Sequence, residues 1–354
     1  MAMIHSVGTA VPEQQLTQED AKKFISSFVS DRRLRRFLNV FDQADISKRH
    51  FVVHPSFFQQ QRSFRERNKL YEEHGVQLAF EAVKKCLNNQ HEVQVPDIDA
   101  IITVNSTGVL TPTLDAQLIN RLDLNDRIIR MPLFGLGCAG GASGLARAYD
   151  YLKAHPTKSV LLVATELASV AFHPDDLTPK DIVGTALFSD GAGAVLLLGT
   201  DHPSNENGPS FQLTASSSRI KKNSMDLMGW DVKDDGFHVI FSREIPELVH
   251  TFWKNHLNDF LANNSIDLSE INQLIAHPGG KKILKNIEEL LYPHQDAHLS
   301  SIVLRQFGNM SSATVLFVLE AFLNEETSKK EGKHLVTALG PGFSSEMLLM
   351  ERSE

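Results

Sequence analysis

The hydrophobic pattern of the chain changes near residue 97. Before that point apolar residues recur at helical spacing over Glu19–Val40 and Ser63–Asn88, so residues 1–95 are expected to be mostly helical. Beyond it, short apolar runs alternate with helical patterns. Because these runs are apolar on both faces, helices should cover both sides of the sheet that they form. Strands are expected at 100–104, 128–133, 160–164 and 192–198, and helices at 115–122 and 145–154.

A polar segment at 201–210, with two prolines and a glycine, divides the chain. After it the same texture begins again. Two halves of like texture predict a duplicated α/β architecture with units at 1–204 and 205–354, although no fixed-period repeat is visible. In the second unit, strands are expected at 212–216, 273–276, 335–338 and 346–350, and helices at 245–263, 281–291 and 311–323.

The composition is that of a globular enzyme that does not bind nucleic acid. Lys and Arg number 35 and Asp and Glu 43, a net charge of 35 − 43 = −8, so an anionic ligand must be met by local basic residues. The longest apolar runs are strand-sized and the N-terminus lacks the features of a signal peptide, which predicts a cytoplasmic protein without a membrane span. Two cysteines, Cys86 and Cys138, indicate a reducing compartment.

Cys138 is the stronger candidate for a nucleophile. It lies in the glycine-rich segment Gly135–Gly144, at an expected strand-to-helix turn. Glycines let a substrate approach the backbone closely, and the start of a helix should lower the pKa of a thiol. A buried structural cysteine is the alternative, and the residues alone do not decide between them. Cys86 lies within a helical pattern and is expected to be structural.

Two more residues carry candidate chemistry. His277 ends an apolar strand, and Asn309 lies in a Gly-Asn turn; helix capping is the alternative for each. A thiol with a histidine and a carboxamide suffices for acyl transfer, because the thiol attacks while the two donors hold the oxyanion. His294 and His298 are spaced four apart in an expected loop, a weak metal pattern, so no metal is expected. The glycine pairs lack the acidic partner of a dinucleotide site.

Several separated motifs resemble those of type III polyketide synthases, the chalcone and stilbene synthase-like branch of the thiolase superfamily. The motifs are GCAGGASGLARAYDYL around Cys138, IVGTALFSDGAGAVL around Phe188, IAHPGG around His277, FGNMSSATVLFVLE around Asn309 and LGPGFSSEMLL at 339–349. The resemblance implies a thiolase fold, in which two duplicated α/β halves form a five-layered αβαβα core. It also implies a homodimer that uses free coenzyme A thioesters and needs no cofactor.

The resemblance also implies roles for single residues. Cys138 would carry the acyl chain and pair with His277, while His277 and Asn309 would bind the thioester carbonyl and promote decarboxylation of malonyl-CoA. Phe188 and Phe237 would be the two gatekeepers between the coenzyme A tunnel and the elongation cavity. Further cavity positions are Val239, Ser106, Thr107, Thr111, Ala171, Ser311, Gly340, Pro341 and Gly342. Arg36 matches a coenzyme A phosphate contact, and the other basic candidates for that contact are Arg49, Lys281 and Lys282.

The expected activity is iterative decarboxylative condensation of malonyl-CoA onto an acyl-CoA starter, followed by cyclisation. Small residues at the expected cavity wall (Ala168, Ala171 and Val239) indicate room for a long aliphatic starter and hence a pyrone or resorcinol-type product. The alternative is a β-ketoacyl carrier-protein synthase III-like enzyme, which shares the Cys, His and Asn but performs a single condensation. A hydroxymethylglutaryl-CoA synthase-like enzyme would need a general-base Glu near the nucleophile, and no Glu lies in the matching motif.

Overall fold

A mixed sheet of nine strands runs through the computed structural model, which describes residues 1–90, 92–205, 211–293, 297–325, 328 and 331–352. Its order is β11-β12-β13-β8-β1-β7-β6-β4-β5, with the second half of the chain on one side of β1 and the first half on the other. The first-half strands are β1 (Ala2–Ala10), β4 (Ala100–Asn105), β5 (Ile129–Phe134), β6 (Ser159–Leu167) and β7 (Asp190–Gly199). The second-half strands are β8 (Phe211–Ile220), β11 (Ile271–Ala276), β12 (Gly332–Gly340) and β13 (Ser344–Arg352).

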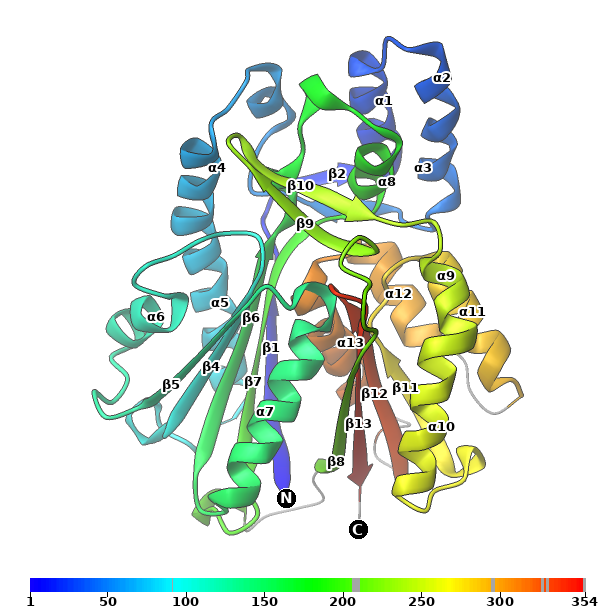
Figure 1. Ribbon diagram of the computed structural model, residues 1–354. Helices are drawn as coiled ribbons and strands as arrows, with labels where there is room; N and C mark the ends of the chain where they lie inside the picture. The colour runs from blue at the N-terminus through cyan, green and yellow to red at the C-terminus, as the bar shows by residue number, and fades with distance from the viewer. Residues whose placement is uncertain (91, 206–210, 294–296, 326–327, 329–330, 353–354) are drawn as a thin grey trace.

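Helices cover both faces of each half-sheet, as the apolar strands predict (Figure 1). Every residue of β6 and β7 is buried. Helices α7 (Gly140–Ala154) and α13 (Thr314–Leu323) contact strands of both halves and form the middle layer. Helices α5 (Val76–Asn88) and α6 (Leu114–Leu122) cover the outer face of the first half, and α10 (Lys254–Asn263) and α11 (Lys281–Leu291) that of the second. This is the five-layered αβαβα arrangement expected from the sequence.

The expectation of a mostly helical segment over residues 1–95 is wrong at its start. Residues 2–10 form the central strand β1, which pairs with β7 and β8. The expected helix over 19–40 is also broken, since Val29 is extended and Asp31 accepts a hydrogen bond from the N–H of Arg33 to begin a new helix. The pieces are α1 (Gln18–Phe28), α2 (Arg32–Arg35), the 3-10 helix η1 (Arg36–Asn39) and α3 (Val40–Gln43).

Two other segments also differ from expectation. His298, expected in a loop, begins helix α12 (His298–Phe307), whereas His294 lies outside the described residues. Of the expected linker, 206–210 likewise lie outside them, and Pro203–Asn205 forms a short 3-10 helix. The remaining helical segments include α4 (Phe64–Leu70), η3 (Tyr71–Gly75), α8 (Pro179–Leu187), α9 (Ile245–Leu248), η9 (Val249–Trp253) and η11 (Ser311–Ala313).

A β-hairpin lies across one end of the central sheet, beside α8 and near the N-terminal helices α1–α3 (Figure 1). Its strands are β9 (Met228–Lys233) and β10 (Gly236–Phe241), which pair only with each other among the described residues. Both chain ends lie at the opposite end of the molecule (Figure 1). The hairpin strand β10 contacts α8 and the 3-10 helix η6 (Ala168–Ala171) that follows β6.

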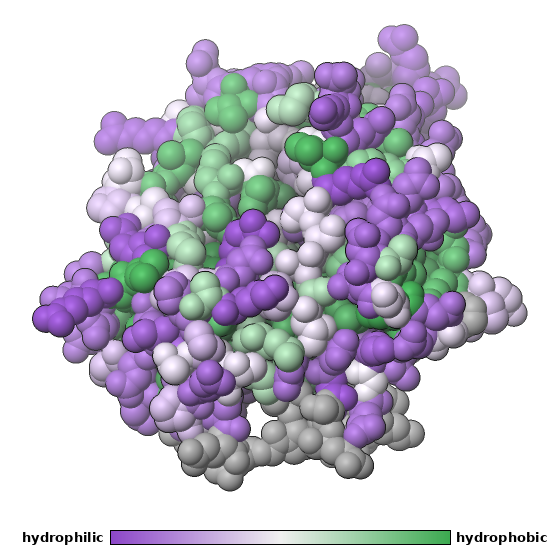
Figure 2. Space-filling model, turned by 60° about the horizontal axis from the view of Figure 1, so that its bottom comes forward, coloured by the Kyte–Doolittle hydropathy of each residue, from purple (hydrophilic) through white to green (hydrophobic). Residues whose placement is uncertain are grey.

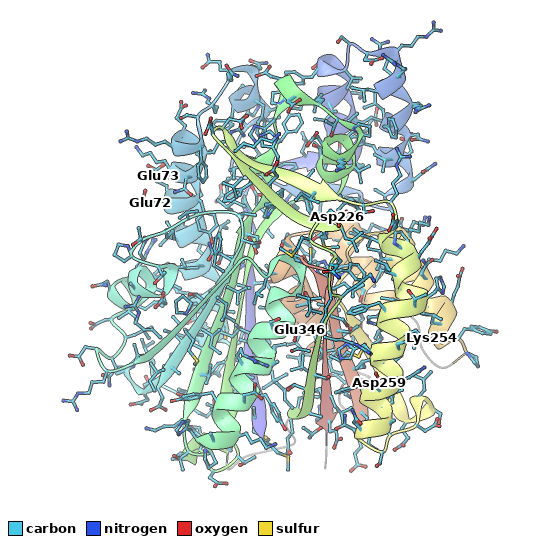
Figure 3. All side chains as sticks on the ribbon, viewed as in Figure 1. Glu72, Glu73, Asp226, Lys254, Asp259 and Glu346 are labelled. Atoms are coloured by element: carbon cyan, nitrogen blue, oxygen red, sulfur yellow. The ribbon has the colours of Figure 1, made fainter. Side chains whose placement is uncertain are left out.

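A buried carboxyl joins the middle layer to the second half-sheet. Glu346 on β13 lies near the centre of the molecule, whereas Lys254 and Asp259 lie along the outer helix α10 (Figure 3). The Ser218 hydroxyl on β8 donates to the Glu346 carboxylate at 2.6 Å, and burial raises the pKa of this carboxyl. Such a group is tolerated inside because its oxygens have donors.

The outer surface carries interspersed hydrophilic and hydrophobic residues on the face shown in Figure 2. No helix within the described residues is long and apolar enough to cross a membrane.

Candidate active site

The turn that holds Cys138 is built by close backbone contact between the two halves of the chain. Cys138 lies in the 3-10 helix η5 (Gly137–Ala139) that leads into α7. Gly137 has φ +48°, and a Cβ there would lie 2.6 Å from Cγ of Pro341. A Cβ on Gly340 would lie 2.5 Å from the Cβ of Ala139. Only glycine allows this approach, so the Gly-Pro-Gly loop of the second half shapes the nucleophile turn of the first.

Cys138, His277 and Asn309 line one pocket with an empty volume of about 400 Å³, which we call the catalytic pocket. The Cys138 sulfur lies 3.8 Å from Oδ1 and 3.9 Å from Nδ2 of Asn309. His277 follows β11, where its N–H donates to the carbonyl of Thr337 at 2.8 Å. The Asn309 N–H donates to the carbonyl of Leu187 at 2.8 Å, ahead of η11. Three segments distant in sequence thus bring the three candidate residues together.

The amide of Asn309 is held in one orientation. Its Oδ1 accepts the N–H of Ser311 at 2.8 Å, and its Nδ2 donates to the carbonyl of Gly279 at 3.4 Å. The second N–H is then free to point toward the Cys138 sulfur. Asn309 therefore caps the next helical turn, the alternative reading of its sequence, and also presents an N–H donor to the pocket.

His277 presents an unpartnered imidazole. Its side chain is buried, and neither ring nitrogen has a hydrogen-bond partner among the described residues. Burial lowers the pKa of His277 to about 3, so the ring is neutral at neutral pH. A neutral ring has one N–H donor and one acceptor nitrogen. The buried ring can therefore donate to a substrate carbonyl or accept a proton from a thiol.

The expectation of a lowered thiol pKa at Cys138 is wrong for the free enzyme. Burial raises the pKa of the Cys138 thiol to about 11, and the charge of Glu166 acts in the same direction. Hydrogen bonds from Ser311 and Asn309 oppose this rise but do not overcome it. Removal of water from the sulfur therefore outweighs the effect of the helix start. The resting site holds a neutral thiol and a neutral imidazole.

Glu166 is a buried carboxylate that the sequence reasoning missed. It accepts hydrogen bonds from the Ser106 N–H and hydroxyl at 3.0 and 2.8 Å, from the Thr107 hydroxyl at 2.7 Å and from the Ser312 hydroxyl at 2.6 Å. Burial raises the pKa of Glu166. The signal was a charged residue, Glu166, inside the fully buried and mostly apolar strand β6. Ser106 and Thr107, expected in the cavity wall, instead bind this carboxylate.

Two further pockets continue from the catalytic pocket. The middle pocket, about 350 Å³, shares Cys138 with the catalytic pocket and is bounded by Phe188, Trp230 and Phe241. The apolar pocket, about 660 Å³, shares Phe188 and Trp230 with the middle pocket. The rings of Phe188 and Trp230 lie 5.7 Å apart between the two pockets. The lining of the apolar pocket also includes Ala21, Phe24, Ile25, Arg49, Phe58, Ala168, Ala171 and Val239.

The expected cavity residues divide between these pockets and other places. Val239 and Ala171 line the apolar pocket, and Ser311 and Pro341 line the middle pocket. Gly340 and Gly342 bend the loop beside Cys138, and Thr111 is exposed in the loop after β4. Phe237, expected as the second gatekeeper, packs 5.3 Å from Phe64 at the hairpin tip, outside all three pockets. Trp230 and Phe241 are the aromatic residues that the hairpin places beside Phe188.

The basic residues expected to contact coenzyme A phosphates differ in exposure. Arg36 is exposed, and its guanidinium lies 5.1 Å from the ring centre of Phe37. The guanidinium of Arg243, which follows the hairpin, lies 5.7 Å from the same ring centre. Lys281 and Lys282 are exposed in the first turn of α11, directly after the glycines that follow His277. These four side chains are free to meet an anion in solvent. Arg243 was not singled out from the sequence because only the folded hairpin brings it near Arg36.

Arg49 has no exposed surface and therefore does not reach the outside of the protein. Its guanidinium donates to the carbonyl of Phe188 at 3.0 Å and to that of Thr185. Burial lowers the pKa of Arg49 to about 9, and the charge of Asp190 opposes this change. The structure thus places Arg49 in the wall of the apolar pocket, where it fixes the backbone of Phe188.

The comparisons with known proteins agree with this arrangement. Residues 1–202 match the family model described as chalcone and stilbene synthases, N-terminal domain, and residues 212–353 match the model of the C-terminal domain. A protein of Bacillus subtilis (strain 168) named as a chalcone synthase is 38% identical over 358 residues, 99% of this chain and 98% of the relative.

A more distant relative and a solved structure extend the match over the whole chain. The alpha-pyrone synthesis polyketide synthase-like Pks18 of Mycobacterium tuberculosis is 29% identical over 362 residues, 99% of this chain and 91% of the relative. The crystal structure of 1,3,6,8-tetrahydroxynaphthalene synthase from Streptomyces coelicolor A3(2), described as a bacterial type III polyketide synthase, has a TM-score of 0.92 and 27% identity over 99% of both chains.

Proposed function

Since the chain belongs to the chalcone and stilbene synthase family and is a type III polyketide synthase, we propose that it extends a long aliphatic acyl-CoA starter with malonyl-CoA. The observation that carries this proposal is the apolar pocket of about 660 Å³. The middle pocket lies between it and the nucleophile, since it is lined by Cys138 and shares Phe188 with the apolar pocket. Ala168 and Ala171 on its wall leave space for an alkyl chain.

Starter loading uses the neutral pair at the active site. His277 accepts the thiol proton as the Cys138 sulfur attacks the thioester carbonyl, and the Asn309 Nδ2–H donates to the oxyanion that develops. The tetrahedral intermediate collapses, the C–S bond to coenzyme A breaks, and the leaving thiolate takes the proton from His277. The acyl group is then bonded to Cys138, and both catalytic side chains are again neutral.

Chain extension uses the same two donors. The thioester carbonyl of malonyl-CoA accepts hydrogen bonds from the His277 ring and the Asn309 amide, so that loss of carbon dioxide leaves an enolate whose oxygen is stabilised. The enolate carbon attacks the acyl carbonyl on Cys138, a C–C bond forms and the C–S bond to Cys138 breaks. The sulfur is thereby released for the next cycle.

The alkyl chain of the starter occupies the apolar pocket. Each methylene that enters it is worth about 0.8 kcal/mol, about fourfold in affinity. The rings of Phe24 and Phe58, from the segment that precedes β4, also line this pocket. A malonyl or other small starter would leave this volume unfilled, so chain length should determine starter preference until the chain reaches these rings.

Cyclisation then releases a pyrone or resorcinol-type product. A pyrone is supported by the Mycobacterium tuberculosis relative, whose name refers to alpha-pyrone synthesis. In this proposal the coenzyme A portion meets the exposed side chains of Arg36, Arg243, Lys281 and Lys282. Their positive charges suit its phosphates.

The proposed assembly is a homodimer joined at β5. This strand ends the sheet order and pairs only with β4 among the described residues. Ile129 and Phe134 on this edge are 47% and 57% exposed, and Val109 in the adjacent loop is 47% exposed. An apolar, unpaired edge favours a second copy. Phe134→Glu should shift the protein from dimer to monomer in analytical ultracentrifugation, whereas an unchanged mass would contradict this assembly.

One assay tests the proposed function. The purified protein is incubated with malonyl-CoA and acyl-CoA starters of rising chain length, with an aromatic acyl-CoA and with no starter, and the products are identified by mass spectrometry. Cys138→Ala is the blank. Pyrones or resorcinols that carry the starter alkyl chain support the proposal, and products from malonyl-CoA or aromatic starters alone contradict it. A strict requirement for an acyl carrier protein would indicate the synthase III-like alternative.

A further inference from the structure

Two histidines and a carboxylate meet at the tip of the β9–β10 hairpin, outside the three pockets. His173 follows the 3-10 helix η6 (Ala168–Ala171), Asp235 lies in the hairpin turn, and His238 lies on β10. Asp235 Oδ2 is 3.2 Å from Nδ1 of His173, and its Oδ1 is 2.8 Å from Nε2 of His238. The two imidazole rings are stacked, with centres 4.0 Å apart. One nitrogen of each ring thus faces the same carboxylate.

The hydrogen-bond pattern leaves the Nδ1 atom of His173 without a suitable partner. Nε2 of this ring lies 3.2 Å from the carbonyl oxygen of Phe237, which only accepts, so Nε2 carries the proton. In the neutral ring the Nδ1 lone pair then faces an oxygen of Asp235, and two acceptors repel each other.

A cation between the three side chains resolves this conflict. An imidazole whose far N–H donates to a main-chain carbonyl is the usual outer arrangement of a metal-binding histidine. His238 needs only the tautomer with its proton on Nδ1 to present a lone pair from Nε2. The Arg67 guanidinium is directed elsewhere, since it donates to the carbonyls of Val170 and Phe172 at 2.6 and 2.9 Å.

We propose that His173 Nδ1, His238 Nε2 and a carboxylate oxygen of Asp235 bind a divalent transition-metal ion, for which zinc is the best fit. The three donor atoms lie within 4.8 Å of one another. Zinc takes imidazole and carboxylate ligands at about 2.0–2.2 Å, so ion binding requires the stacked rings to turn until both lone pairs point at the ion. Calcium and magnesium prefer oxygen-only sites. Asp235 is 42% exposed, which gives the ion an entry path and room for a water ligand.

The ion has a structural task rather than a catalytic one. Gly236, with φ +142°, lets the hairpin backbone approach His173 so closely that a Cβ would lie 3.3 Å from the ring. The same hairpin carries Trp230 and Phe241 into the middle pocket. The ion therefore fastens the hairpin tip to the segment that follows β6 and holds this wall of the pocket in place.

Metal binding by the whole protein tests the proposal without any substrate. Protein stripped with a chelator is titrated with zinc, the bound metal is counted by mass spectrometry, and affinity is measured by competition with a chromophoric chelator. Asp235→Asn is compared with Asp234→Asn, the same change at the exposed neighbouring residue. His238→Gln is compared with His250→Gln, at an exposed histidine on η9.

The unmodified protein, Asp234→Asn and His250→Gln should each bind one zinc ion, and zinc should raise their melting temperature. Asp235→Asn and His238→Gln should bind zinc much more weakly. Loss of a residue that only supports a metal ligand costs about 10- to 100-fold in affinity, and loss of a ligand itself should cost more. Less than one zinc ion in the unmodified protein would overturn the proposal. Equal zinc affinity in Asp235→Asn and Asp234→Asn would overturn it as well. Product formation can succeed or fail independently of these results.

Discussion

The Arg49 guanidinium donates to the main-chain carbonyl of Phe188 at 3.0 Å from a position with no exposed surface. The same group donates to the carbonyl of Thr185, and both acceptors belong to the segment that brings Phe188 between the middle and apolar pockets. Arg49 lies on β3 (Lys48–His50), a short strand of the N-terminal segment. The N-terminal segment therefore holds the aromatic wall of the site through one buried cation.

Arg49→Met should lower the free energy of unfolding by at least about 2 kcal/mol, because two buried carbonyls lose their donor at about 1–3 kcal/mol each. Asp190, whose pKa burial raises to about 6, also loses the nearby positive charge. Urea unfolding of Arg49→Met and of the exposed control Arg243→Met measures the difference. Equal stability of the two single variants would contradict this role.

Asn309→Asp should slow release of carbon dioxide from malonyl-CoA by about 10²- to 10³-fold, the usual cost of removing one oxyanion donor. The substitution keeps an oxygen that can accept the Ser311 N–H, removes the Nδ2 donor that faces the Cys138 sulfur and the carbonyl of Gly279, and places a carboxyl oxygen there instead. Asn324→Asp, at an exposed position after α13, is the matched control. A rate within a few fold of that of the control would show that the amide N–H does not stabilise the enolate.

Alkylation of Cys138 by iodoacetamide should accelerate about tenfold for each pH unit between pH 6 and pH 9. The reason is that burial raises the pKa of the thiol to about 11, so only a small and steadily rising fraction is thiolate in this range. Rates in Cys138→Ala are subtracted to remove reaction at Cys86. A rate that levels off below pH 8 would instead indicate a resting thiolate stabilised by the helix start.

Ala171→Phe should shift starter preference toward shorter chains, because the new ring would fill part of the apolar pocket. For each methylene excluded, the preference for the long chain should fall about fourfold. Competition between a long and a short acyl-CoA, read out as the ratio of products, measures the shift. Ala262→Phe, on the exposed side of α10, is the control. An unchanged ratio in Ala171→Phe would place the alkyl chain elsewhere.

The strands at the centre of the fold could be predicted from sequence because they are short apolar runs with no competing pattern. The expected strand at 192–198, for example, lies inside β7. The strand β1 could not be predicted in this way, because apolar and polar residues do not alternate clearly in AMIHSVGTA. Its pairing with β7 and β8 decides its structure. The end of helix α1 at Phe28 could not be predicted either, because the residues on both sides of it favour a helix.

The candidate site could likewise be predicted only in part from the sequence. Cys138, His277 and Asn309 could be found because glycine-rich turns surround them and their motifs resemble a known family. The direction in which the pKa of the Cys138 thiol shifts could not be predicted from the sequence, because it depends on how much water the fold removes from the sulfur. The cluster of His173 with Asp235 and His238 joins residues 62 or more positions apart on either side of the expected domain boundary, and only the folded hairpin brings them together.

The most direct test of the central claim is the intact mass of the protein after incubation with a long-chain acyl-CoA and no malonyl-CoA. The account predicts one added acyl group, located by peptide mapping on Cys138 and absent from Cys138→Ala. It also predicts greater labelling by long-chain than by acetyl or aromatic thioesters at equal concentration, because the apolar pocket receives the chain. No adduct, or an adduct that persists in Cys138→Ala, would contradict the account.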